Sequence, residues 1–209
     1  IITADIDNDF DQDIIVNDIS IIKTPGGGTW NLNDSLNKFE TDSNNDSDAV
    51  ISGDLNRDGN SEIIVGGSGE SIMIYDNGYQ QICEGDLCAS WVSSQNYDVL
   101  SLDLGDVNKD GFLDLAIGIE NGHDKILFGF ESPDGVVQFN ESVPLWTSDN
   151  IQDTSVVRLL DIDDDDYLDL FTGAANDDGR IDKMFFGYSE ENSGNVVSTI
   201  SNSPNWTSS

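Results

Sequence analysis

The sequence predicts an all-β protein built from four repeats of roughly four strands each. An acidic motif recurs four times, starting at Asp5, Asp54, Asp106 and Asp161, at spacings of 49, 52 and 55 residues. Short apolar segments follow the motifs and are separated by turns rich in Gly, Asn and Asp. Almost no stretch has helical periodicity. A repeat of this length is typical of blades and solenoid units.

The composition fits one folded domain and argues against two kinds of partner. A chain of 209 residues with 37% hydrophobic residues is long enough to bury a core. The 41 acidic and 8 basic residues give a formal net charge of -33, which repels nucleic acid and anionic membranes. No apolar run approaches the ~18 residues of a membrane span. We therefore expect no nucleic-acid partner and no direct membrane insertion. Because the sequence starts at Ile1 without a signal sequence, we expect a mature or excised piece.

The four repeats form a single domain, 1–209, and share one plan. A β-rich strand leads into the acidic loop, a second strand leaves it, a third follows a Gly/Asn/Asp turn, and a fourth contains Trp. In the third repeat the expected strands are 99–104, 114–119, 125–130 and 143–148, and in the fourth they are 155–160, 169–174, 183–188 and 204–209. The approximate repeat bounds are 1–48, 49–98, 99–153 and 154–209.

The first repeat is the least regular of the four. Between Trp30 and Val50 the chain is polar and rich in Asn, Asp and Ser. We expect 31–49 to be an inserted surface loop.

The acidic loop has the chemistry of a calcium site. Oxygen-bearing side chains occupy positions one, three, five and nine in every copy, and position seven can offer a backbone carbonyl. Hard oxygen ligands without His or Cys suit calcium better than zinc or copper, and magnesium prefers a smaller octahedron. An EF-hand would need Glu at position twelve and flanking helices. Position twelve is instead apolar or Thr: Val16, Val65, Ile117 and Thr172.

These loops resemble FG-GAP repeats, also called VCBS repeats, the calcium-binding blades of integrin α-chain β-propellers and many bacterial surface proteins. The resemblance covers nearly the whole chain and implies a β-propeller or propeller-like blade array with about four Ca²⁺ ions. It implies side-chain ligands at Asp5, Asp7, Asp9 and Asp13; Asp54, Asn56, Asp58 and Glu62; Asp106, Asn108, Asp110 and Asp114; and Asp161, Asp163, Asp165 and Asp169. It implies carbonyl ligands at Asp11, Asn60, Phe112 and Tyr167.

Two loops depart from the pattern at position six, where the turn favours a positive φ. Gly59 and Gly111 meet this need, whereas the outer loops have Phe10 and Asp166. Asp tolerates such a φ, and Phe tolerates it poorly. At position nine of the second loop, Glu62 is one methylene longer than Asp, which loosens that cage slightly.

Cysteine, tryptophan and asparagine residues suggest further features. Cys83 and Cys88 flank a short loop, and we expect a local disulfide, with two reduced thiols as the alternative. One Trp lies late in each repeat, and we expect packing between blades, with sugar stacking as the alternative. The four tryptophans are Trp30, Trp91, Trp146 and Trp206. Sequons that could carry N-glycans begin at Asn33, Asn45, Asn140 and Asn205.

Catalysis finds little support in the sequence. The only histidine, His123, lies in a turn without a nucleophile motif, and the carboxylates are committed to the loops. We expect a non-enzymatic calcium-binding structural or adhesion module, extracellular or on the cell surface. It would bind copies of itself, other extracellular proteins or glycans, and it could assemble into an array or filament. The alternatives are a lectin-like recognition module and, less favoured, a calcium-dependent polysaccharide-active enzyme.

Overall fold

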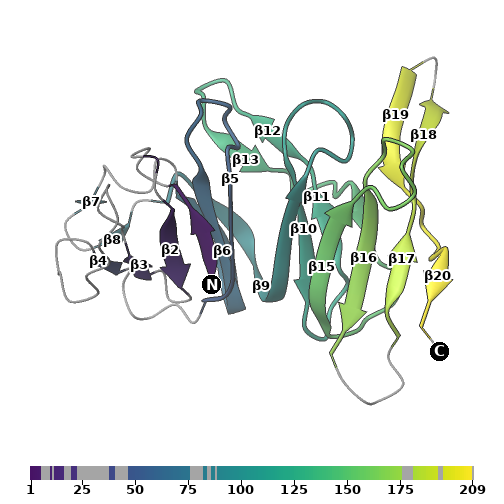
Figure 1. Cartoon of the computed structure of the whole chain (residues 1–209), viewed down its shortest axis with the longest axis horizontal. Coiled ribbons are helices and arrows are strands. Elements are labelled where there is room, and N and C mark those ends of the chain that lie inside the picture. Colours follow the sequence, from purple (N-terminus) through teal and green to yellow (C-terminus); the bar gives the residue numbers. More distant parts are fainter. Residues whose placement is uncertain are drawn as a thin grey trace. The chain divides into compact units, whose positions relative to one another are not determined.

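The computed structural model describes residues 1–5, 10, 12–16, 20–22, 38–40, 47–75, 82–83, 86–87, 89–175, 181–192 and 195–208 (Figure 1). In these residues the secondary structure is β-strand with connecting turns, and no helix occurs among them. Nothing in this described part is therefore a helix that could cross a membrane. The prediction of an all-β fold with propeller-like blades is confirmed. The chain divides into two compact units, Ile1–Tyr97 and Asp98–Ser209.

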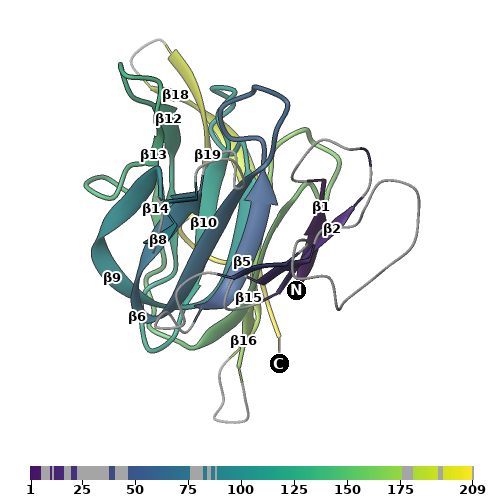
Figure 2. The ribbon, with the colours of Figure 1, turned by 90° about the vertical axis from the view of Figure 1, so that its left-hand side faces the viewer.

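Unit 1 contains a four-stranded antiparallel sheet and part of a second sheet (Figure 2). The four-stranded sheet, called here the β2 sheet, consists of β1 (Ile2–Ala4), β2 (Asp13–Val16), β3 (Ser20–Ile22) and β4 (Lys38–Glu40) in that order. In the second sheet β6 (Glu62–Tyr75) lies between β5 (Ser47–Gly53) and the first part of β9 (Trp91–Gly105), and a short ladder joins β7 (Ile82–Cys83) to β8 (Asp86–Leu87). Strand β4 and the start of β5 lie within 31–49, which we predicted to be a loop.

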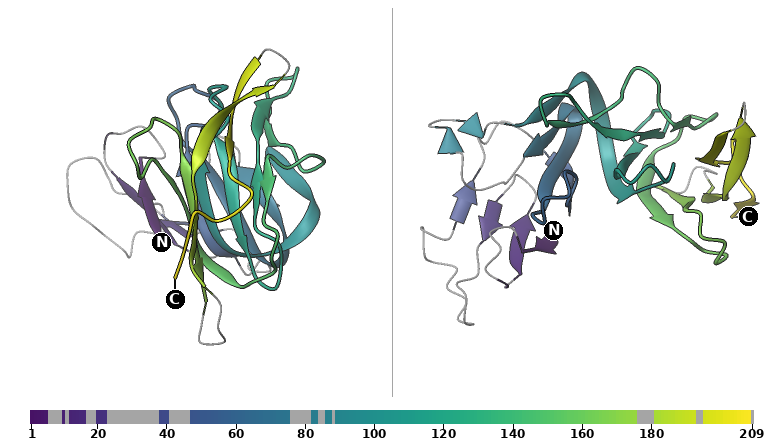
Figure 3. Two further views of the ribbon diagram at one scale, coloured as in Figure 1. Left: turned by 90° about the vertical axis from the view of Figure 1, so that its right-hand side faces the viewer. Right: turned by 90° about the horizontal axis from the view of Figure 1, so that it is seen from above.

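Unit 2 contains two four-stranded antiparallel sheets with the same strand order. The β10 sheet consists of β9 (Trp91–Gly105), from Asp98 onward, with β10 (Asp114–Ile119), β11 (Lys125–Leu127) and β14 (Trp146–Thr147). The β16 sheet consists of β15 (Thr154–Leu160), β16 (Asp169–Ala174), β17 (Lys183–Phe185) and β20 (Trp206–Thr207). Each third strand is followed by a hairpin: β12 (Gly129–Glu131) with β13 (Val137–Phe139), and β18 (Gly187–Asn192) with β19 (Asn195–Ile200), yellow in Figure 3.

Two strand predictions need correction. The expected third strands 125–130 and 183–188 are each interrupted, because β11 ends at Leu127 and β17 ends at Phe185. In both, the next strand starts at a glycine whose backbone N–H turns toward the acidic loop. In unit 1, β6 runs without a break through Gly66–Glu70, where the Gly-rich sequence favoured a turn, and only Gly69 has a positive φ (71°) there.

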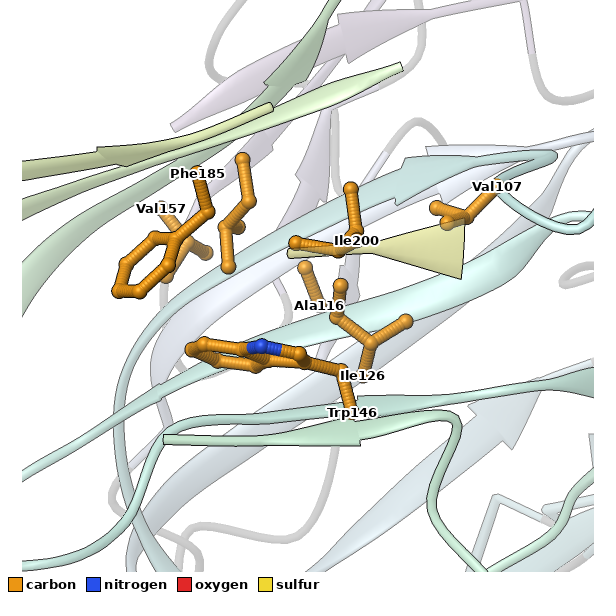
Figure 4. Packing of buried hydrophobic residues seen from close by; sticks show 8 residues of the cluster. Val107, Ala116, Ile126, Trp146, Val157, Phe185 and Ile200 are labelled. Carbon is orange, nitrogen blue, oxygen red and sulfur yellow. The ribbon is translucent and has the colours of Figure 1, made fainter. Parts of the chain in front are cut away.

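A hydrophobic core lies within each unit. In unit 1, Ala4 and Ile15 of the β2 sheet pack with Ile63, Val65 and Tyr75 of β6. In unit 2 the core joins the facing sides of the β10 and β16 sheets (Figure 4), and its members are Val107, Ala116, Ile126, Trp146, Val157, Leu170, Phe185 and Ile200. The rings of Trp146 and Phe185 meet edge to face, with centroids 4.9 Å apart. Trp146 is only 3% exposed, which confirms the packing role predicted for this tryptophan.

A serine two residues after tryptophan forms a hydrogen bond that links the fourth strand of a sheet to the third strand. The Oγ atoms of Ser148 and Ser208 accept hydrogen bonds from the backbone N–H groups of Asp124 and Asp182, both at 2.9 Å. In unit 1, Ser93 Oγ accepts in the same way from Ile72 N at 2.8 Å. The Trp-x-Ser pattern therefore has a structural purpose that the sequence alone did not reveal.

Candidate metal centre

The acidic loops connect the first and second strands of each sheet, as predicted. Position nine is always the first residue of the second strand, and it pairs with the residue just before position one. In the third loop, for example, Asp114 pairs with Gly105 and Asp106 follows. Each loop is thus closed at its base by a β-ladder, and its first and ninth side chains start from neighbouring strands.

Left-handed backbone at two fixed positions curls the loops. At position six, φ is 72° at Phe10, 90° at Gly59 and Gly111, and 71° at Asp166. Phe10 therefore adopts the conformation that the sequence favours poorly, and its side chain is 95% exposed. At position four, φ is 62° at Arg57, 58° at Lys109 and 60° at Asp164, which sequence reasoning missed.

The position-one carboxylate holds the curled backbone. One oxygen of Asp106 accepts a hydrogen bond from Gly111 N at 2.9 Å, and the equivalent bonds join Asp5 to Phe10 (3.0 Å), Asp54 to Gly59 (3.1 Å) and Asp161 to Asp166 (2.9 Å). The other oxygen of Asp106, Oδ1, is buried, and no described group hydrogen-bonds to it. A buried carboxylate oxygen without a partner is costly, so this atom marks a place for a cation.

Position nine is buried and forms the floor of each loop. Asp13, Asp114 and Asp169 are 0% exposed, and Glu62 is 1% exposed. The Oδ2 atom of Asp114 accepts from Val107 N at 2.9 Å, and its Oδ1 accepts from Gly129 N at 3.0 Å.

The fourth loop repeats this arrangement. Asp169 accepts from Ile162 N at 2.9 Å and from Gly187 N at 2.8 Å. A Cβ on Gly129 would lie 2.2 Å from the Leu113 carbonyl oxygen, and one on Gly187 would lie 2.3 Å from that of Leu168. Only glycine lets the chain come this close to the loop at the start of β12 and β18. Sequence reasoning missed both glycines, although each follows a phenylalanine at the same place in its repeat.

The electrostatics show that carboxylates are crowded in the absence of a cation. Burial raises the pKa of Asp114 to about 7, despite three backbone hydrogen bonds that favour its charged form. The pKa of Asp163 is also raised, first through loss of hydration and then through three neighbouring loop carboxylates, that of Asp165 foremost. Carboxylate oxygens of Asp161, Asp163 and Asp169 all lie within 4.8 Å of one another. Such spacing suits oxygen atoms that share one ion.

The donor set fits calcium. In the second loop, Asn56 Nδ2 lies 3.3 Å from both Asp58 Oδ2 and Glu62 Oε1, so positions three, five and nine converge there as well. In the third loop, Asn108 and Asp110 are joined by a 2.9 Å hydrogen bond. The carbonyl ligands at Asn60, Phe112 and Tyr167, which occupy position seven, stay a prediction. Asp7, Asp9 and Asp11 lie outside the described residues, so of the first loop's predicted ligands only Asp5 and Asp13 are placed.

Adjacent loops of unit 2 touch through a cation–π contact. The Nζ atom of Lys109, at position four of the third loop, lies 3.8 Å from the ring centroid of Tyr167, at position seven of the fourth. This contact holds the two loops side by side and keeps the lysine's charge close to the acidic sites.

Several other predicted features remain predictions. Cys88 and the side chain of Cys83 lie outside the described residues, and so do Trp30, Asn33 and Asn45. The side-chain oxygens of Asn140 and Asn205 accept hydrogen bonds, from Ser142 N at 3.0 Å and from Phe186 N at 2.8 Å. His123 is exposed, with Nδ1 2.6 Å from the Ser148 carbonyl oxygen.

Comparison with protein families gives one match. Residues 54–117 match the model of an FG-GAP-like repeat. The matched segment includes the second and third acidic loops, β6 and β9, and most of β10. It confirms the resemblance that the acidic motifs indicated. A search of curated proteins found no match to the chain.

Proposed function

We propose that the chain is a calcium-stabilised, propeller-type module with a structural or adhesive role outside the cell. The observation that carries the calcium assignment is the convergence of Asp161, Asp163 and Asp169 in a curled hairpin loop. The buried, unpartnered Oδ1 of Asp106 at the equivalent place in the third loop supports it independently. The four sequence copies imply about four ions.

Hydrogen bonds within the chain hold the carboxylates of the site in position before calcium binds. In the third and fourth loops, backbone N–H groups hold at least one oxygen of the position-one carboxylate and both oxygens of the position-nine carboxylate, so these groups lose little freedom on binding. Positions three and five lie on the exposed rim, where they can close over an ion. Bound calcium would supply the positive charge that relieves repulsion among the carboxylates.

The stabilisation expected from calcium is large for a chain of this size. Extracellular modules bind calcium with dissociation constants near 10⁻⁴ M, and tenfold excess calcium then stabilises each site by about 1.4 kcal/mol. Four sites would contribute roughly 6 kcal/mol, comparable to the stability of an ordinary domain. Without bound calcium the repeats would therefore lose a free energy comparable to the whole stability of the fold.

Thermal unfolding with and without calcium tests this role. We expect the melting temperature to fall by well over 5 °C in excess EDTA and to recover when calcium is restored. The double variant Asp161→Asn and Asp163→Asn should lose part of the calcium-dependent gain. A control that neutralises the same charge outside the loops, Asp149→Asn with Glu131→Gln, should keep all of it. A melting temperature unchanged by EDTA would overturn the proposal.

The extracellular role rests on the family match. FG-GAP repeats usually occur in extracellular proteins and are typically non-enzymatic. A net charge of -33 favours solubility and is compatible with sites that take up divalent cations. Absence of turnover on a panel of acidic polysaccharides, combined with calcium-dependent adhesion to cells or to immobilised protein, would support a structural module.

A lectin-like function is the second candidate, and Trp206 is the observation that favours it. This tryptophan is 48% exposed, as a sugar-stacking ring must be. Quenching of tryptophan fluorescence by a soluble glycan, lost in Trp206→Ala but kept in Val143→Ala, would select this candidate.

A further inference from the structure

A row of four buried polar side chains connects the third and fourth repeats within unit 2. Lys183 Nζ donates to Gln152 Oε1 at 2.9 Å, and Gln152 Nε2 donates to Thr154 Oγ1 at 3.0 Å. The Thr154 hydroxyl donates in turn to Asp124 Oδ2 at 2.8 Å. Each of the four residues is at most 6% exposed. An amine, an amide and a carboxyl group therefore share one site that is shielded from solvent.

Lys183 and Gln152 are a nucleophile and an electrophile held in contact. Lys183 is the first residue of β17, and Gln152 lies just before β15, where it bridges to Gly122 of the third repeat. The hydrogen bond places the lysine nitrogen on the amide oxygen, one covalent bond away from Cδ, the carbon that a nucleophile attacks. Two groups that the fold already holds together lose little freedom when they react, which is the main advantage of an intramolecular reaction.

Asp124 and Thr154 can supply the proton transfers that exchange of an amide requires. Burial raises the pKa of Asp124 to about 6, so its carboxylate binds a proton more strongly than that of an ordinary Asp. The positive charges that act on Asp124 are those of Lys183 and of His123 in its protonated form. The Thr154 hydroxyl lies between Asp124 and the amide nitrogen, so it can pass a proton to that nitrogen as it leaves.

We propose that Lys183 and Gln152 react to form an intramolecular isopeptide bond between the third and fourth repeats. Asp124 takes a proton from the lysine ammonium group, and the neutral Nζ attacks Cδ of Gln152. A bond forms between Nζ and Cδ, the bond between Cδ and Nε2 breaks, and Nε2 leaves as ammonia after it receives a proton through Thr154. Overall, one ammonium group and one primary amide give one secondary amide and one ammonium ion. The reaction needs neither calcium nor an oxidant, so the inference goes beyond the proposed function.

The equivalent place in the third repeat lacks the reacting pair. Lys125 corresponds to Lys183, because each begins the third strand of its sheet and pairs with the threonine that follows tryptophan. Gln152 lies nine positions before the fourth acidic loop, and the residue nine positions before the third loop is Tyr97, which has no amide. Lys125 is also only half-buried. Lys125 is therefore a matched control for Lys183.

The bond would close the segment 152–183, which contains the fourth acidic loop, into a covalent ring. Closing a loop restricts the unfolded chain more than the folded one. The cross-link would therefore stabilise the fourth repeat both with and without calcium.

Mass spectrometry of the denatured and reduced chain tests the proposal. We expect a mass lower than the sequence mass by that of one ammonia molecule. Trypsin should leave 126–158 joined to 181–209, because a modified Lys183 is no longer a cleavage site. Lys183→Arg should restore the sequence mass, whereas Lys125→Arg should keep the loss. After refolding, Thr154→Val should form the bond at least tenfold more slowly than Thr154→Ser, which keeps the hydroxyl, with circular dichroism showing that both variants are folded.

The native chain alone decides the inference, so it does not depend on whether a variant folds. The full sequence mass, with 126–158 recovered as a free peptide, would overturn the inference and leave the calcium sites standing. An ammonia loss confined to one peptide, with 126–158 and 184–209 recovered separately, would also overturn it. Equal rates of bond formation in Thr154→Val and Thr154→Ser would overturn the assigned proton route.

Discussion

Replacing Gly129 with alanine should disrupt the third acidic loop from a distance of fifteen residues. The N–H group of Gly129 donates to Asp114 Oδ1 at 3.0 Å, and a new Cβ would lie 2.2 Å from the Leu113 carbonyl oxygen. The contact is with backbone that begins β10, so it cannot be relieved by a side-chain rotation. The start of β12 must move away, and Asp114 loses a hydrogen bond while it stays buried.

The cost follows from two terms. Overpacking in a close-packed interior costs about 1–3 kcal/mol. Loss of a hydrogen bond to a buried carboxylate costs about 1.5–3 kcal/mol. Together they predict a destabilisation of about 2.5–6 kcal/mol, and a fall in melting temperature on the order of 10 °C for a chain of this size.

Urea denaturation in excess calcium measures the effect, with Gly173→Ala as the matched control. Gly173 is also a buried strand glycine, but its built Cβ comes no closer than 3.4 Å to any neighbour. We expect the control to stay within about 1 kcal/mol of the native chain. Equal unfolding midpoints for the two variants would show that the approach of Gly129 to the loop does not matter.

Three further perturbations have defined outcomes. Burial raises the pKa of Asp124 to about 6. Its protonation therefore contributes to the free energy of unfolding fully below about pH 4, and this contribution is lost as the pH rises through 6. Relative to Asp124→Asn, the native chain should lose about 3 kcal/mol of stability between pH 4 and pH 7 in urea denaturation. Lys109→Ala removes the contact with Tyr167 and should cost about 0.5–1 kcal/mol, which Lys109→Arg should retain in a thermal melt. Ser148→Ala leaves the N–H of Asp124 without its acceptor and should cost about 1–3 kcal/mol in the same assay.

Local patterns in the sequence predicted the loops and their flanking strands. The alternation of oxygen-bearing residues identified the nine positions of each acidic loop. The strands that follow the third and fourth loops, β10 and β16, begin at Asp114 and Asp169, as predicted. Both strands also end where predicted, at Ile119 and Ala174. These features depend on neighbours along the chain, which is the information that a single sequence holds most directly.

Contacts between distant segments could not be predicted. The dependence of Asp114 on Gly129 exists only because the chain returns to the base of the loop at the start of β12. The hydrogen bond between Ser148 and Asp124 likewise joins residues that lie 24 positions apart, and the recurring Trp-x-Ser pattern does not itself show which backbone group the serine binds. Nor could the sequence show that β6 continues through Gly69, because glycine favours turns and β-bulges alike.

Native mass spectrometry in millimolar calcium, which counts bound ions directly, tests the central claim about the acidic loops. The calcium assignment predicts four ions on the folded chain, and one fewer in the double variant Asp161→Asn and Asp163→Asn. Folded protein that takes up no calcium in this experiment would contradict it.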